Sequence, residues 1–113
     1  MHELSITQNI LSIALEEAKK AQANKITKIE VTIGELSGFV NDCIKFYFDF
    51  ASKDTIASGA TLSFHNSPAK LRCRQCDIVF TPTDHEWLCP NCHEPTVEIV
   101  SGREAYVNSI EVY

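Results

Sequence analysis

Apolar side chains recur every three or four residues in the first part of the chain, which predicts an amphipathic helix. The positions that form this stripe are Ile6, Ile10, Ile13, Ala14, Ala18 and Ala21. Ser5 and Gln8 have the spacing of a capping box, so we expect the helix to begin near Ser5. Asn24 can end the helix near residue 23.

Alternation of polar and apolar positions predicts strands further along the chain. The strands predicted in this way are residues 28–33, 60–66, 97–100 and 104–113. In the second of them we expect Leu62 and Phe64 to face inward, and Pro68 closes the strand. Gly102 lies in the turn between the last two predicted strands.

The segment of residues 40–51 fits two patterns. An alternating set favours a strand: Ile44, Phe46, Phe48 and Phe50. A set at helical spacing favours a helix: Cys43, Phe46, Tyr47, Phe50 and Ala51. We favour a helix capped by Asn41 or Asp42, because of the segment's length and its Asn-Asp start. Within it, Cys43 is expected to be a small buried hydrophobe.

These elements predict an α+β fold, with two helices packed on a small mixed β-sheet and an inserted zinc-ribbon module. The last strand needs a sheet to join, so residues 1–68 are expected to form an α/β domain that strands within 97–113 complete. Residues 69–96 then form the metal-binding module. A module this small cannot bury enough surface alone, and a structural zinc ion supplies folding energy on the order of 10–16 kcal/mol.

Two C-x-x-C pairs are the strongest chemical signal in the sequence. The cysteines are Cys73, Cys76, Cys89 and Cys92. Pairs with this spacing can place four thiolates around one Zn²⁺ in a closed structural site, which leaves no position for a catalytic water. Two disulfides would need an oxidising compartment, and iron in a rubredoxin-like centre is the rival metal.

Charged and imidazole side chains next to these pairs leave alternatives open. Lys70, Arg72 and Arg74 either offset the negative charge of the thiolates or form a solvated patch. His93 directly follows the last cysteine, where it is either a ligand and pH sensor or an exposed loop histidine.

Composition then narrows the class of protein. The chain has 113 residues, 44% of them hydrophobic, with a net charge of −5 and a pI of about 5.3. An acidic chain argues against nucleic-acid binding. No apolar segment is long enough to span a membrane, and we expect no signal peptide. Four of five cysteines in C-x-x-C pairs fit a reducing, cytoplasmic environment.

The first three residues form a second candidate metal site. The α-amine of Met1, with the amide and imidazole nitrogens of His2, can close adjacent chelate rings on one ion. The amide or carboxylate of Glu3 can complete a fourth position. Nitrogen-rich tetragonal sites favour Ni²⁺ or Cu²⁺, and binding should weaken as pH falls because it releases protons.

Four segments, in matching order over essentially the whole chain, resemble the hydrogenase maturation factor HypA/HybF family. These segments are Met1-His2-Glu3-Leu4-Ser5, Ile33-Gly34-Glu35-Leu36-Ser37-Gly38, the two C-x-x-C pairs, and Ser101-Gly102-Arg103-Glu104. The resemblance implies a nickel metallochaperone, with transferable Ni²⁺ on Met1, His2 and Glu3 and structural Zn²⁺ on the four cysteines. It also implies delivery of Ni²⁺ to the large-subunit precursor of nickel–iron hydrogenase, in partnership with the accessory GTPase HypB. Some relatives also serve urease maturation.

Several alternatives and further residues remain open. Asp42 could approach the N-terminus, and His85 and His93 could contribute to nickel binding. The rival function is a zinc-ribbon protein-interaction module with no metal cargo. An enzyme is not expected, because no catalytic pairing of side chains stands out. Exposed strand edges would allow a homodimer.

Overall fold

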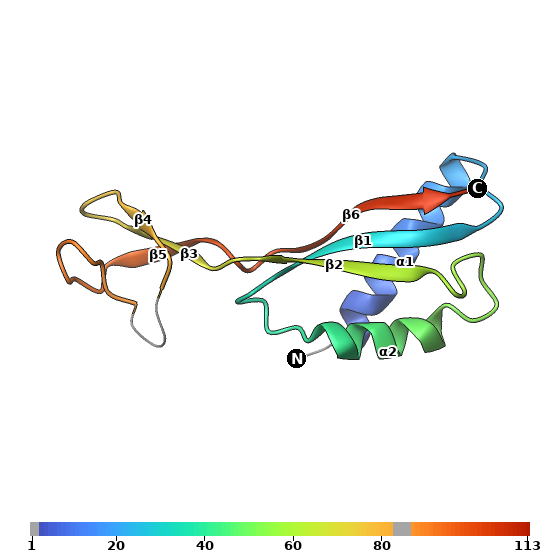
Figure 1. Ribbon diagram of the computed structural model, residues 1–113, viewed down its shortest axis with the longest axis horizontal. Coiled ribbons are helices and arrows are strands. Elements are labelled where there is room, and N and C mark those ends of the chain that lie inside the picture. The colour runs from blue at the N-terminus through green and yellow to red at the C-terminus, as the bar shows by residue number, and fades with distance from the viewer. Residues whose placement is uncertain (1–2, 83–86) are drawn as a thin grey trace.

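The computed structural model describes residues 3–82 and 87–113. Two helices and six strands in this part of the chain follow one another along the sequence (Figure 1). In order they are α1 (Glu3–Lys20), β1 (Ile26–Gly34), α2 (Asn41–Ala51), β2 (Thr61–Ser67), β3 (Lys70–Cys73), β4 (Val79–Phe80), β5 (Val97–Ser101) and β6 (Ala105–Val112). The predicted α+β class and the helical choice for residues 40–51 are confirmed.

The first sheet has the strand order β2-β1-β6 and is mixed, as predicted. Strand β1 pairs in parallel with β2, so α2 is the crossover that joins them, and β1 pairs antiparallel with β6. Both helices lie on the same side of this sheet (Figure 1). We refer to α1, α2 and this sheet together as the helical unit.

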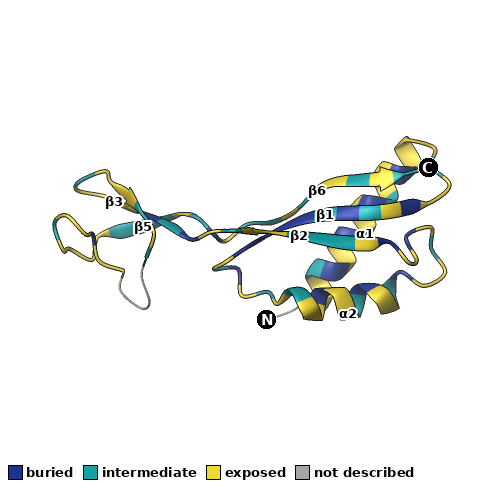
Figure 2. Cartoon of the chain, viewed as in Figure 1, coloured by how far each residue is buried: buried dark blue, intermediate teal, exposed yellow. Residues whose placement is uncertain are grey.

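The core lies between the helices and the first sheet, where the dark-blue segments of the two layers face each other (Figure 2). Its buried members come from both helices, from β1 and from the segment before β2: Ile10, Leu11, Ala14, Ala18, Ile26, Ile29, Val31, Ile33, Ile44, Phe48, Ala57 and Ala60. Leu62 and Phe64 of β2 pack against this cluster, as predicted. Alternation along β1 therefore leaves its polar side chains on the open face of the sheet.

The boundaries of α1 differ from the prediction. The helix begins at Glu3, so Ser5 lies within its first turn and does not cap it. It ends at Lys20, where Gln22 takes a positive φ of 54° and turns the chain toward β1. Ile13, which was expected on the buried stripe, is 38% exposed, and Thr7 is buried in the first turns of the helix.

The predicted cap of α2 is wrong, as is the predicted burial of Cys43. The N-cap is Val40, whose side chain cannot cap, and both Asn41 and Asp42 lie within the helix. Ile44 and Phe48 provide the buried side of α2, while Cys43 lies on its exposed side.

The second sheet has the order β4-β3-β5 and carries the cysteine pairs. We call this part of the chain the cysteine module (residues 70–101). Strand β5 pairs with β3. The sequence-based prediction instead places the strands of residues 97–113 in the first sheet. The division into 1–68 with 97–113 and an inserted 69–96 remains a proposal, and strand pairing places β5 with the insertion.

The helical unit and the cysteine module lie end to end, which gives an elongated molecule of 55 × 24 × 17 Å (Figure 1). Among the described helices, none combines the length and the apolar character needed to cross a bilayer.

Candidate metal centre

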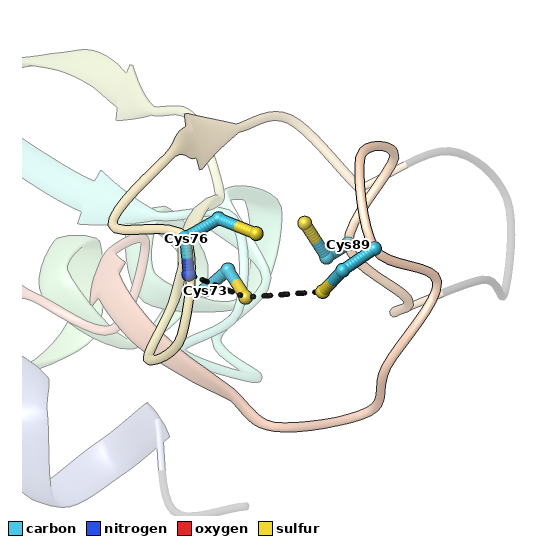
Figure 3. A group of neighbouring side chains, drawn as sticks. Cys73, Cys76 and Cys89 are labelled. Atoms are coloured by element: carbon cyan, nitrogen blue, oxygen red, sulfur yellow. Dashed lines mark hydrogen bonds between the residues drawn. The ribbon is translucent and has the colours of Figure 1, made fainter.

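The four cysteines of the two C-x-x-C pairs converge on one point. Cys73 ends β3 and Cys76 lies in the turn that follows, while Cys89 and Cys92 come from the turn before β5. Their sulfur atoms all lie within 4.8 Å of one another. The side chains of Cys73, Cys76 and Cys89 are labelled in Figure 3. Tetrahedral coordination with Zn–S bonds of about 2.3 Å would place sulfurs about 3.8 Å apart. The Sγ atoms of Cys73 and Cys92, 3.6 Å apart, already match that spacing.

Both pairs have the same local backbone geometry. In the first, the amide of Asp77 donates to the carbonyl of Cys73 at 2.9 Å, and in the second, the amide of His93 donates to the carbonyl of Cys89 at 2.8 Å. Asp77 and His93 both have positive φ angles, 60° and 62°, which turn the chain back after each pair. The sequence therefore builds two matching knuckles that present their sulfurs to each other.

Backbone amides inside the knuckles also donate to sulfur. The amide of Cys76 donates to Cys73 Sγ and the amide of Asn91 to Cys89 Sγ, both at 3.4 Å. The Asn91 side chain adds a hydrogen bond to Cys76 Sγ at 3.3 Å. Donors placed in this way stabilise thiolates, and thiolates are the form in which cysteine binds a metal.

The pKa values of Cys73 and Cys92 indicate that four neighbouring thiolates need a cation. Hydrogen bonding from the amide of Cys76 lowers the pKa of Cys73 to about 7. The amide of Glu94 lowers the pKa of Cys92, but burial and the three other thiols outweigh it and raise that pKa to about 12. The positive charge of a divalent ion at the centre would offset the repulsion between neighbouring thiolates. Four sulfur donors in a tetrahedral arrangement fit Zn²⁺ in a closed site.

The cations beside the first knuckle do not contact the sulfurs. Arg72 forms ion pairs with Glu98 and, at 3.4 Å, with Asp77. Arg74 lies 3.8 Å from Glu98, and the Lys70 ammonium donates to Thr81 at 2.7 Å. Their charges are therefore engaged with polar groups of the cysteine module, and the hydrogen bonds to the sulfurs come from amide donors instead.

The second candidate metal site is only partly within the described residues. Met1 and His2 lie outside them, and Glu3 is the first residue of α1. The Glu3 carboxylate accepts a hydrogen bond from the amide of Val40 at 3.2 Å, and the Thr7 hydroxyl donates to the Glu3 carbonyl at 2.5 Å. The first of these bonds ties the start of α1 to the start of α2, and the second lies within α1.

A cavity of about 570 Å³ adjoins this point. Val40 lines it, together with Asp42 from the first turn of α2, Glu35 from the turn after β1 and Asn66 near the end of β2. The Asn41 side chain donates to that of Asn66 at 3.3 Å. Asp42 follows two residues after Val40, whose amide donates to the Glu3 carboxylate, and its approach to the N-terminus stays a prediction.

The three other histidines, His65, His85 and His93, lie elsewhere in the chain. His93 is exposed in the second knuckle, in the unit opposite α1, and His85 lies outside the described residues. His65 is on β2, 3.1 Å from Glu30 on the open face of the first sheet. Among the described residues, the four cysteines are the only metal-ligand cluster. The role of Asn91 was missed by sequence reasoning, although its place inside a knuckle could have suggested it.

Comparison with known proteins adds an independent observation. The family model described as "Hydrogenase/urease nickel incorporation, metallochaperone, hypA" matches residues 1–112. The hydrogenase maturation factor HypA of Dehalococcoides mccartyi strain 195 is 44% identical over 112 residues, which cover 99% of this chain and 94% of the relative. That of Caldanaerobacter subterraneus is 43% identical over 113 residues and covers 99% of both chains.

Solved structures of such proteins have the same fold. A solution structure of a HypA protein aligns with a TM-score of 0.77 at 30% identity and covers 100% of this chain and 97% of that one. The nickel metallochaperone HypA from Helicobacter pylori aligns with a TM-score of 0.71 at 30% identity, covering 99% and 97%.

Proposed function

The chain belongs to the HypA family of hydrogenase/urease nickel-incorporation metallochaperones, and we propose that it carries Ni²⁺ on its N-terminal residues for hydrogenase maturation. Members of this family are maturation factors, so the chain is not an enzyme. The single observation that carries the proposal is the family match over residues 1–112, which begins at the Met1-His2-Glu3 chelate sequence.

The proposed nickel ligands are the amine of Met1, the amide and imidazole nitrogens of His2, and the amide or carboxylate of Glu3. Because α1 begins at Glu3, the amides of its first turn have no acceptor within the helix, and the Glu3 amide is free for metal binding. The carboxylate of Glu3 contacts Val40, so the backbone nitrogen is the more accessible of its two donors.

The position at a helix start also supports reversible binding. The N-terminal end of a helix carries partial positive charge, which opposes a nearby cation by about 0.3–1 kcal/mol. The same field favours the deprotonated amides that a chelate of this kind requires. A carrier must release its cargo, and a site with these opposing contributions would hold Ni²⁺ only moderately.

The four-cysteine cluster is proposed to hold a structural Zn²⁺. Cys73 and Cys89 are buried and their sulfurs accept from backbone amides, and the Asn91 side chain donates to Cys76 Sγ. A closed set of four sulfurs exchanges slowly and leaves no ligand position for a client protein, which suits a permanent ion rather than cargo. The two metals would then have separate roles in separate units.

The partners follow from the proposed role. We propose that the chain works in the cytoplasm with the accessory GTPase HypB and passes Ni²⁺ to the large-subunit precursor of nickel–iron hydrogenase. Urease is a further candidate client, since the family description includes it. No nucleic acid or membrane partner is proposed, and exposed strand edges leave a homodimer open.

Calorimetric titration of Ni²⁺ into tag-free, zinc-loaded protein tests the proposal. We expect wild-type protein to bind Ni²⁺ and His2→Ala to lose that binding with its zinc content and fold intact. His65→Ala is the matched control, because His65 lies on the open face of the sheet. His93→Ala measures any contribution from the cysteine module.

Two outcomes would contradict the proposal in different ways. Unchanged nickel affinity in His2→Ala would reject the N-terminal site. Failure of zinc-loaded wild-type protein to bind Ni²⁺ at neutral pH would favour the alternative function, a zinc-ribbon interaction module without cargo. An N-terminal tag must be avoided in both cases, since it removes the amine ligand.

A further inference from the structure

The two units of the molecule meet where β1 ends and its neighbours continue. Strand β2 runs on through residues 68–69 into β3, and β5 runs through residues 102–104 into β6. In the first sheet β1 separates β2 from β6, whereas in the second sheet β3 and β5 pair directly. Two chain segments therefore connect the units, and they come together just past Gly34.

The turn after β1 clamps both connecting segments. The amides of Gly34 and Leu36 donate to the carbonyls of Glu104 and Gly102, each at 2.6 Å, which holds the segment between β5 and β6. Between these two bonds, the amide of Glu35 donates to the carbonyl of Ser67 at 2.8 Å and so holds the end of β2.

The side chain of Glu104 joins the two connecting segments to each other. One carboxylate oxygen accepts from the amide of Gly102 at 2.5 Å, and the other accepts from the hydroxyl of Ser67 at 2.9 Å. Glu104 is half-buried, and both of its oxygens are thus used inside the junction. A carboxylate bonded in this way gives charge-assisted hydrogen bonds, which are stronger than neutral ones.

We propose that Glu104 is a positioning residue, whose carboxylate fixes the cysteine module at one orientation relative to the helical unit. Without it, the connection would consist of two extended segments, the backbone bonds of one turn, and the hydrogen bond that the Ser101 hydroxyl donates to the Pro68 carbonyl at 2.9 Å. The functional consequence rests on the proposed function. Glu35 lines the cavity beside Val40, the partner of Glu3, so the junction adjoins the region where nickel is proposed to bind.

Residual dipolar couplings measured by NMR on the full-length, zinc-loaded protein test this inference. If the units are locked, amides of both units fit one alignment tensor. In Glu104→Ala we expect the single tensor to be lost, while zinc content and the spectrum within each unit are retained. Glu104→Gln should restore the common tensor, because its amide can accept from Gly102 and donate to Ser67.

Glu111→Ala is the matched control, since Glu111 lies on β6, the strand that directly follows Glu104, and pairs with Lys28 on the sheet surface at 3.7 Å. This variant should behave as wild type. A common tensor in Glu104→Ala, or an equal loss in Glu111→Ala, would overturn the proposal. If Glu104→Ala does not fold, Ser67→Ala decides: it removes one arm of the contact and should weaken the common alignment, and an unchanged tensor there refutes the proposal.

A second measurement separates this inference from the proposed function. Nickel affinity of Glu104→Ala should stay within about twofold of wild type, while the transfer of Ni²⁺ to a client that contacts both units should slow. The alignment result stands whether or not wild-type protein binds nickel. Loss of nickel affinity with unchanged alignment would contradict a purely positioning role.

Discussion

Gly34 lies directly against the backbone of Gly102, at the point where the two sheets join. A Cβ atom at residue 34 would overlap the Gly102 carbonyl and lie 2.8 Å from the amide nitrogen of Arg103. Gly102 has a φ of +112°, and a Cβ there would lie 2.9 Å from the Cα of Ala69. The resemblance motifs around residues 34 and 102 therefore meet in space, and glycine is needed at both positions because backbone approaches backbone.

Gly34→Ala should destabilise the protein through this overlap. Overpacking typically costs about 1–3 kcal/mol, and the neighbours at Gly34 are backbone atoms that cannot change rotamer. Denaturant unfolding measures the loss. Gly59→Ala is the control, because nothing lies within 4 Å of its Cβ and only its positive φ of +82° is strained. The junction model further requires that Gly34→Ala, and not Gly59→Ala, disturbs the common alignment of the two units.

Phe48 and Phe50 test the helical assignment of α2. Phe48 is 1% exposed and Phe50 is 72% exposed, although both would lie on one face of a strand. Phe48→Ala should cost about 3–5 kcal/mol in unfolding free energy, as for other buried aromatic truncations. Phe50→Ala should change it by less than about 0.5 kcal/mol, as for ordinary surface positions. Similar losses for the two variants would contradict the packing of α2.

Local spacing explains which features could be predicted from the sequence. The core positions of β1 and most of those of α1 follow from periodicity, and the convergence of the cysteines follows from two short knuckles. Helix caps were predicted wrongly at both helices, because Glu3 rather than Ser5 starts α1 and Val40 precedes α2. Capping residues have short local signals that tertiary contacts override, here the bond between Glu3 and Val40.

Features set by strand pairing could not be predicted. Arg72 and Glu98 are register partners on β3 and β5, so their ion pair depends on a pairing between segments far apart in the sequence. The sequence-based prediction puts β5 in the first sheet. Arg72 is therefore interpreted there only as a cation next to the cysteine pair that follows it in the chain. The contacts of Glu104 were hidden for the same reason.

Acidification should weaken the junction through Glu104. Hydrogen bonds from its own amide, from the Gly102 amide and from the Ser67 hydroxyl lower the pKa of Glu104 below its usual 4.5. A carboxyl with a depressed folded-state pKa stabilises the fold above its unfolded pKa, and loses that contribution as pH falls through the folded value. Protonation of Glu104 should therefore disfavour the folded state only below about pH 4.5.

The unfolding free energies of wild type and Glu104→Gln, measured between pH 7 and pH 3, isolate this effect, because zinc loss at acid pH affects both proteins. Their difference should be constant near neutrality and should shift against wild type as pH falls below about 4.5. A difference that first changes well above that pH would show that Glu104 is not stabilised in its ionised form.

Zinc removal should unfold the cysteine module and leave the helical unit folded. The core of the helical unit contains no residue of the module, and a structural zinc site supplies on the order of 10–16 kcal/mol of apparent binding energy. Cys73→Ser should reproduce the effect of a chelator, because Cys73 is fully buried and a hydroxyl is a poor zinc ligand. In amide NMR spectra, signals from β3 and β5 should collapse toward random-coil positions while those of β1 remain dispersed.

Cys43→Ser is the matched control: Cys43 is exposed on α2, so this variant should retain one zinc ion per chain by elemental analysis. Equal zinc content in the two variants would exclude the four-cysteine site, and loss of the β1 signals on zinc removal would show that the two units fold as one.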